Sequence, residues 1–99
     1  MTENQEAVLL WAINTYGVEH QKRKAVEELS ELITELAREQ ERTDRDRIME
    51  ELADSIIMCQ QLRTIYGAAE VDKWIEKKTG RLFLRLRALT LSMETGDRP

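Results

Sequence analysis

Four carboxylates in the sequence stand in two pairs, and each pair has the spacing that lets a helix present both groups together. Glu28 and Glu31 are three residues apart, and so are Glu51 and Asp54. Residues three or four apart on a helix share a face. If the two helices pack antiparallel, the pairs face one another, and their charges repel unless a cation lies between them.

The second pair lies on a stripe that is otherwise apolar. At about 100° per residue, Glu51 and Asp54 are followed along the same face by Met58, Leu62 and Ile65. A carboxylate placed there must be paired, protonated or bound to a metal. Ligands that are all oxygen suit Mg²⁺, Mn²⁺ or Ca²⁺, and Mg²⁺ commonly adds substrate phosphates to its ligands. The pattern therefore predicts a cation site for a phosphorylated substrate.

Acidic residues are also common on solvated helix faces, and this is the competing interpretation for Glu28 and Glu31 taken alone. We assign the following acids to such a solvated face: Glu27, Glu35, Glu39 and Glu41. A di-iron carboxylate bundle needs Glu-x-x-His pairs, and the sole histidine, His20, follows no glutamate at that spacing. The single cysteine, Cys59, excludes a disulfide within the chain and a cysteine-based zinc site.

Four helices are expected to position these groups. Apolar residues recur at helical spacing over residues 5–16, 18–41, 44–66 and 68–89. Gly17 and Gly67 are the expected breaks after the first and third helices, and Thr43 with Asp46 resembles a capping box before the third. Gly80 lies inside the fourth helix, where it marks a kink or a close approach.

The composition fits this helical pattern. The chain has 99 residues, of which 34% are charged and 5% aromatic, with one proline and four glycines. This balance favours helices over strands. We predict an all-α, four-helix bundle-like fold in a single domain over residues 1–99, with a flexible tail from about residue 91. Since a domain of this size buries little surface, we expect oligomerisation to complete it.

The net charge of −4 gives no general attraction to nucleic acid or to an anionic membrane, so we expect neither partner. The first residues are acidic and polar, unlike a signal peptide, and no apolar run is long enough to span a bilayer. A cytoplasmic location is the resulting expectation.

The acidic pairs resemble a known family motif. Glu27-Glu28-Leu29-Ser30-Glu31 followed by Glu51-Leu52-Ala53-Asp54 is similar to the E-E-x-x-E … E-x-x-D signature of the MazG-like, all-α nucleoside triphosphate pyrophosphohydrolases. Residues 16–21 resemble the start of that family's metal-binding helix. Ile75, Lys78, Arg81 and Leu82 resemble a basic stretch on its last helix. The resemblance covers most of the chain.

The resemblance implies Mg²⁺-dependent hydrolysis of a nucleoside triphosphate to a monophosphate and pyrophosphate, in a homodimer or homotetramer. The metal ligands that it implies are Glu28, Glu31, Glu51 and Asp54, with Glu27 as a catalytic candidate that positions or deprotonates the water. Mn²⁺ is an alternative metal.

Several further residues are candidates for substrate binding. Lys78 and Arg81 are candidates for phosphate contacts, although a solvated basic face explains them equally. Lys24 is a candidate for a phosphate contact or a helix salt bridge. Gln21 and Trp11 are candidates for base recognition, and core packing is the competing interpretation of Trp11.

Two alternatives stay open. One is phosphoribosyl-ATP pyrophosphohydrolase activity, and the other is a non-catalytic helical adaptor or regulator with a relic cation site. The residues after Asp54, which are Ser55, Ile56, Ile57 and Met58, include no strong reader of a nucleobase. The sequence therefore leaves the base undetermined.

Overall fold

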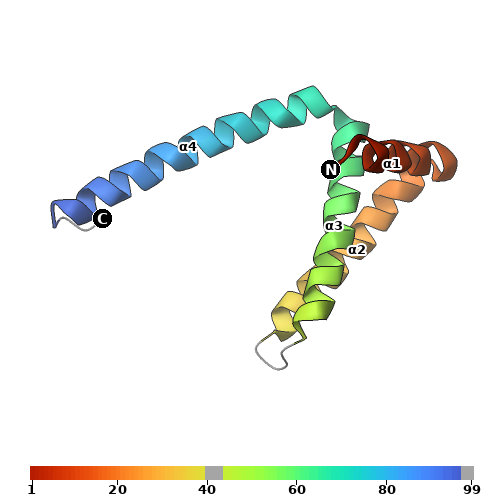
Figure 1. Ribbon diagram of the computed structural model, residues 1–99, viewed down its shortest axis with the longest axis horizontal. Coiled ribbons are helices and arrows are strands. Elements are labelled where there is room, and N and C mark those ends of the chain that lie inside the picture. The colour runs from red at the N-terminus through yellow and green to blue at the C-terminus, as the bar shows by residue number, and fades with distance from the viewer. Residues whose placement is uncertain (40–43, 97–99) are drawn as a thin grey trace. The chain divides into compact units, whose positions relative to one another are not determined.

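The computed structural model describes residues 1–39 and 44–96, and every regular element in those ranges is a helix. The helices are α1 (Glu3–Tyr16), α2 (Val18–Arg38), α3 (Arg45–Tyr66) and α4 (Ala68–Glu94) (Figure 1). The all-α prediction is confirmed. The chain divides into two compact units, Met1–Tyr66 with α1 to α3 and Gly67–Pro99 with α4.

Side chains at two helix starts cap the backbone. Thr2 Oγ1 accepts a hydrogen bond from the Gln5 amide at 3.1 Å, and Gln5 Oε1 accepts one from the Thr2 amide at 2.9 Å. This capping box begins α1 at Glu3, earlier than the predicted residue 5. Before α3, Asp44 Oδ1 accepts from the Arg47 amide at 3.1 Å. Asp44 is thus a cap of α3, whereas the predicted cap Thr43 lies outside the described residues.

Two glycines separate helices as the sequence predicted. Gly17 has φ +92° between α1 and α2, and Gly67 has φ +119° between α3 and α4. Side chains with a Cβ rarely adopt these backbone angles, so glycine allows the chain to turn within one residue. The short turn at Gly17 keeps α1 next to the hairpin that follows.

The helix α4 is longer than the sequence predicted. It continues to Glu94, whereas the sequence predicted its end near residue 89. The flexibility of the tail from about residue 91 stays a prediction. A Cβ placed on Gly80 meets no atom within 4 Å, so this glycine permits no close approach among the described residues. None of the 27 residues of α4, all of them described, is buried.

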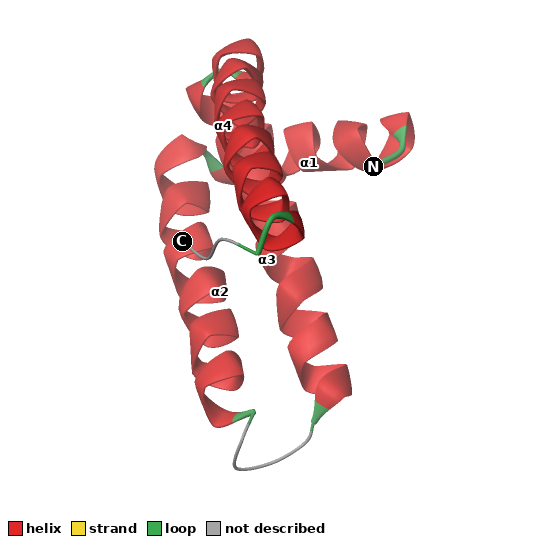
Figure 2. Cartoon of the chain, turned by 90° about the vertical axis from the view of Figure 1, so that its left-hand side faces the viewer, coloured by secondary structure: helices red, strands yellow, loops and turns green. Residues whose placement is uncertain are grey.

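The core of the first unit lies between α2 and α3, which run side by side and antiparallel (Figure 2). The buried residues follow helical spacing on both helices: Gln21, Ala25, Glu28 and Glu35 on α2, and Glu51, Ser55, Met58 and Gln61 on α3. The helix α1 lies across the end of this hairpin where α2 begins and α3 ends, and it buries Ile13. The α2–α3 seam is therefore mostly polar.

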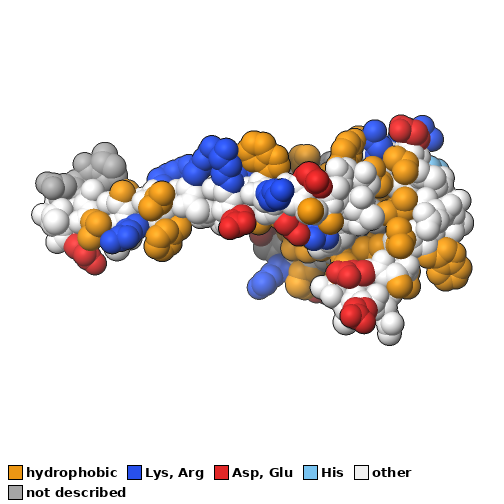
Figure 3. Space-filling model, turned by 90° about the horizontal axis from the view of Figure 1, so that it is seen from above, with side chains coloured by type: hydrophobic (Ala, Val, Ile, Leu, Met, Phe, Trp, Pro, Cys, Tyr) orange, Lys and Arg blue, Asp and Glu red, His pale blue; other side chains and the backbone are white. Residues whose placement is uncertain are grey.

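Most large apolar side chains stay on the surface. Val26 and Ile33 are each 67% exposed, and Met49, Leu52 and Ile56 on α3 are also exposed. Figure 3 shows hydrophobic side chains at the surface of the first unit and, along α4, hydrophobic side chains interleaved with lysine and arginine. Because the seam buries few apolar atoms, hydrophobic burial within the unit contributes little to its stability.

A buried pair of glutamine side chains connects α2 to α3. Gln21 Nε2 donates to Gln61 Oε1 at 2.7 Å, and Gln21 Oε1 is 2.7 Å from His20 Nδ1. Gln61 Nε2 also lies 3.6 Å from the sulfur of Met58. Since both glutamines are buried, each amide depends on these partners rather than on water.

We therefore expect Gln61→Met, which keeps the volume and removes the acceptor, to lower the free energy of unfolding by about 1–3 kcal/mol, because Gln21 Nε2 stays buried without an acceptor. Urea unfolding measures this loss. The double variant Gln21→Met/Gln61→Met should recover most of it. A Gln61→Met variant as stable as the wild type would show that the amide pair contributes nothing.

Candidate metal centre

Three of the predicted ligands converge across the α2–α3 seam. Glu28 of α2 and Glu51 and Asp54 of α3 each offer a carboxylate oxygen, and these three oxygens all lie within 4.8 Å of one another. Glu28 retains 9% of its surface and Glu51 4%. Helical spacing places Glu51 and Asp54 on one face, and the antiparallel packing of α2 brings Glu28 opposite them. Three oxygens at this separation can bind one hard cation.

The buried carboxylates each leave one oxygen without a partner. Glu28 Oε2 and Glu51 Oε2 are buried and have no hydrogen-bond partner within the described part of the chain. The other oxygen of each is taken, since Lys24 Nζ lies 3.2 Å from Glu28 Oε1 and Arg47 Nη2 lies 3.5 Å from Glu51 Oε1. An unpartnered buried carboxylate oxygen is costly. A cation between the helices would satisfy both oxygens.

The carboxylates affect one another's protonation. Burial raises the pKa of Glu51 above its ordinary value, and the Glu31 carboxylate raises it further, while Arg47 opposes the shift. Burial also raises the pKa of Asp54, with Glu28 and then Glu50 adding to it and Lys24 opposing. The site therefore favours protonation or a bound cation over free charges.

The remaining acidic candidates lie around these three. Glu31 is exposed and is not among the three residues that share the 4.8 Å separation, although its carboxylate acts on Glu51. Glu27 is exposed and forms an ion pair with Lys24 at 3.6 Å. Lys24 thus bridges Glu27 and Glu28, and the Glu28 carboxylate, followed by that of Glu27, raises the pKa of its ammonium. This is the salt bridge that the sequence offered as one interpretation of Lys24.

Glu35 corrects one expectation. The sequence placed it on a solvated face, but it is 8% exposed and lies 3.6 Å from Arg47 Nε. Glu35 follows Glu28 by seven residues, which is about two turns of α2, so the two side chains lie on the same helix face. That face packs against α3. Arg47 was missed, and its spacing of four residues before Glu51 is the signal that could have found it. Glu39 is exposed as expected, and Glu41 lies outside the described residues.

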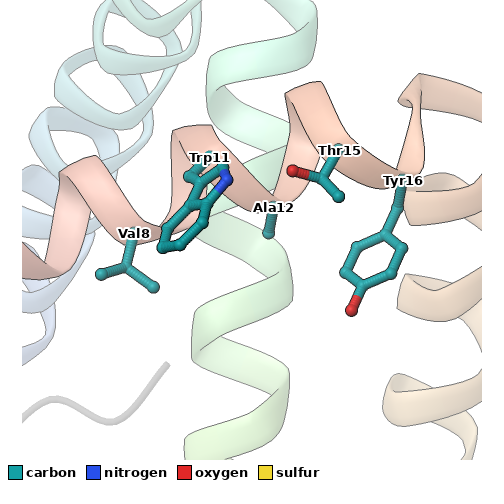
Figure 4. Close-up of a pocket in the computed structure, with 5 residues that line it drawn as sticks. All are labelled: Val8, Trp11, Ala12, Thr15 and Tyr16. Carbon is teal, nitrogen blue, oxygen red and sulfur yellow. The ribbon is translucent and has the colours of Figure 1, made fainter.

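The two base-recognition candidates lie in different surroundings. Gln21 is buried in the seam, with its amide bonded to Gln61. Trp11 is 71% exposed, so the expectation that it packs in a core is wrong. Figure 4 shows it in a shallow surface pocket lined from one helix by Val8, Trp11, Ala12, Thr15 and Tyr16. An exposed indole face is free to stack on a planar group.

The phosphate-contact candidates Lys78 and Arg81 are exposed on α4, in the second unit. Their spacing of three residues places them on neighbouring turns of one helix face. Their role in phosphate binding stays a prediction.

Comparisons with protein-family models, curated proteins and solved structures gave no match. The residues themselves therefore carry the functional argument. In the described ranges, no helix combines the length and apolarity needed to cross a membrane.

The raised pKa values determine how stability depends on pH. A carboxyl whose pKa is higher in the folded state contributes stability below its unfolded pKa, and this contribution is lost as pH rises through its folded pKa. Without metal, we expect Glu51→Gln to equal the wild type in stability near about pH 4 and to exceed it near about pH 7. Thermal unfolding across this range measures the difference. A constant difference at all pH values would contradict the buried, mutually repelling carboxylates.

Mg²⁺ should reverse this order of stability, so that the wild type becomes more stable than Glu51→Gln. A ligand that binds only the folded state stabilises it by mass action, so Mg²⁺ at about 100 times its Kd should raise the wild-type Tm by about 10 °C or more. Glu51→Gln and Asp54→Asn should lose most of this shift, whereas the exposed Glu39→Gln should keep it. An unchanged shift in Glu51→Gln would remove this carboxylate from the site.

Proposed function

We propose that this chain is a Mg²⁺-dependent nucleoside triphosphate pyrophosphohydrolase. In the reaction, a water oxygen bonds to the α-phosphorus and the bond from that phosphorus to the α–β bridging oxygen breaks. The products are a nucleoside monophosphate and pyrophosphate. The proposal includes the MazG-like family of the resembling motif and its four-helix fold, completed by oligomerisation.

The observation that carries the proposal is the pair of unpartnered buried oxygens on Glu28 and Glu51, beside Asp54. An oxygen-only donor set fits Mg²⁺ or Mn²⁺ better than a metal that prefers sulfur or imidazole. When bound, Mg²⁺ supplies neutralisation of phosphate charge and polarisation of water. Substrate oxygens could serve as further ligands, since three carboxylates are fewer than the six ligands that Mg²⁺ takes.

Side chains of this protein would bind the metal, contact the attacking water and contact the phosphates. Glu28, Glu51 and Asp54 would hold the metal, and the exposed Glu31, whose carboxylate acts on that of Glu51, would add a further ligand. Glu27 is exposed beside the cluster and can accept a hydrogen bond from the attacking water. Lys24, protonated between Glu27 and Glu28, can turn to a phosphate oxygen. Lys78 and Arg81 are proposed to bind the outer phosphates.

The exposed apolar faces of α2 and α3 support the proposed homodimer or homotetramer. Val26, Ile33, Leu52 and Ile56 lie at 44–67% exposure on the same two helices that carry the carboxylates. Burying them between copies would stabilise the unit whose own seam is polar.

A product assay tests the function. The protein is incubated with Mg²⁺ and a panel of ribo- and deoxynucleoside triphosphates plus phosphoribosyl-ATP. We expect pyrophosphate and the monophosphate that corresponds to the substrate. Asp54→Asn should lower kcat/KM at least about 100-fold because it removes a metal ligand, and Glu39→Gln should leave it unchanged. Release of orthophosphate and a diphosphate would exclude α–β cleavage. No turnover of any substrate, with metal binding intact, would favour the non-catalytic adaptor.

A further inference from the structure

Arg47 contacts carboxylates on both sides of the seam. Its Nε lies 3.6 Å from Glu35 Oε1 of α2, and its Nη2 lies 3.5 Å from Glu51 Oε1 on its own helix. Both carboxylates are buried, at 8% and 4% exposure, whereas the Arg47 side chain is 51% exposed. The guanidinium therefore lies at the solvent-exposed edge of the α2–α3 contact and connects the two helices.

The two contacts use different nitrogens of one rigid plane. A guanidinium holds its nitrogens in one rigid plane, so two carboxylates that contact different nitrogens are neutralised together and held at a set separation. Only Oε1 of Glu51 faces Arg47, and Oε2 is the buried oxygen without a partner. The ion pair thus occupies one oxygen of a carboxylate that belongs to the cluster with Glu28 and Asp54 and leaves the other oxygen available to a cation.

The helix α2 repeats this arrangement. Lys24 stands four residues before Glu28 and takes its Oε1, as Arg47 stands four residues before Glu51 and takes its Oε1. In both cases the oxygen that remains is buried and unpartnered. A lysine is a single point charge on a flexible stem, whereas the arginine also reaches the opposite helix.

We propose that Arg47 is a positioning residue for the cation site, which holds the Glu51 carboxylate and the α2–α3 spacing by bridging Glu51 to Glu35. This inference rests on the metal site of the proposed function and not on its substrate. Groups that orient a metal ligand from outside typically contribute about 10- to 100-fold to metal affinity.

A competing role makes the opposite prediction. If Arg47 acted only as a positive charge near the site, its removal would strengthen cation binding, because it would remove repulsion. If it positions Glu51, its removal weakens cation binding although the site becomes more negative. The direction of the change therefore separates the two roles.

The test is Mn²⁺ binding to the full chain, followed through the free-Mn²⁺ signal in electron paramagnetic resonance, without substrate. We expect Arg47→Gln to weaken binding about tenfold. Arg47→Lys, which keeps the charge but not the fork, should recover only part of the affinity. The matched control Arg45→Gln removes the same charge from an exposed position two residues away, and its affinity should equal or slightly exceed that of the wild type.

Circular dichroism verifies that each variant is folded, and if Arg47→Gln is unfolded, Arg47→Lys decides in its place. Unchanged or tighter Mn²⁺ binding in Arg47→Gln, or full affinity in Arg47→Lys, would overturn the inference. So would a wild type that binds no Mn²⁺. The two proposals can also be separated. If Arg47→Gln weakens Mn²⁺ binding but the wild type hydrolyses no nucleotide, the positioning role is supported and the proposed function is excluded.

Discussion

The repulsion among carboxylates in the α2–α3 seam is the constraint on which the rest of the first unit depends. Glu28, Glu51 and Asp54 are brought within 4.8 Å by the same packing that holds the two helices together. Helices do not bury acids at their contact for stability, because desolvation and like charge both oppose it. Lys24 and Arg47 offset part of this cost and leave one oxygen of each buried glutamate for a cation.

Most of the residues buried between α2 and α3 are polar or charged, so polar contacts dominate the interior of the first unit. The buried apolar residues of the first unit are few, namely Ile13, Ala25 and Met58 among the described residues, and hydrogen bonds such as that between Gln21 and Gln61 accompany them. A polar seam specifies the pairing of two helices through matched partners rather than through buried area. The larger apolar side chains lie on the outer faces, where another subunit can cover them.

The sequence predicted the elements well because helical periodicity, glycine breaks and capping residues are local signals. It also predicted, for antiparallel helices, that Glu28 and Glu31 meet Glu51 and Asp54, because residue spacing fixes which side chains share a face; three of these four lie together and Glu31 is not among them. It did not predict how far the contact face of α2 extends beyond Glu28, since the polar set and the apolar set that includes Val26 and Ile33 are both periodic. That extent depends on contacts between helices and explains why Glu35 was expected in solvent.

If the cation site exists, the carboxylates of α2 and α3 bind one hard cation between them. Crystals grown with Mn²⁺ and measured at a wavelength where manganese scatters anomalously test it directly. We expect an anomalous peak with carboxylate oxygens of Glu28, Glu51 and Asp54 at about 2.1 Å. A peak elsewhere on the chain, or a well-ordered seam without a peak at saturating Mn²⁺, would contradict it.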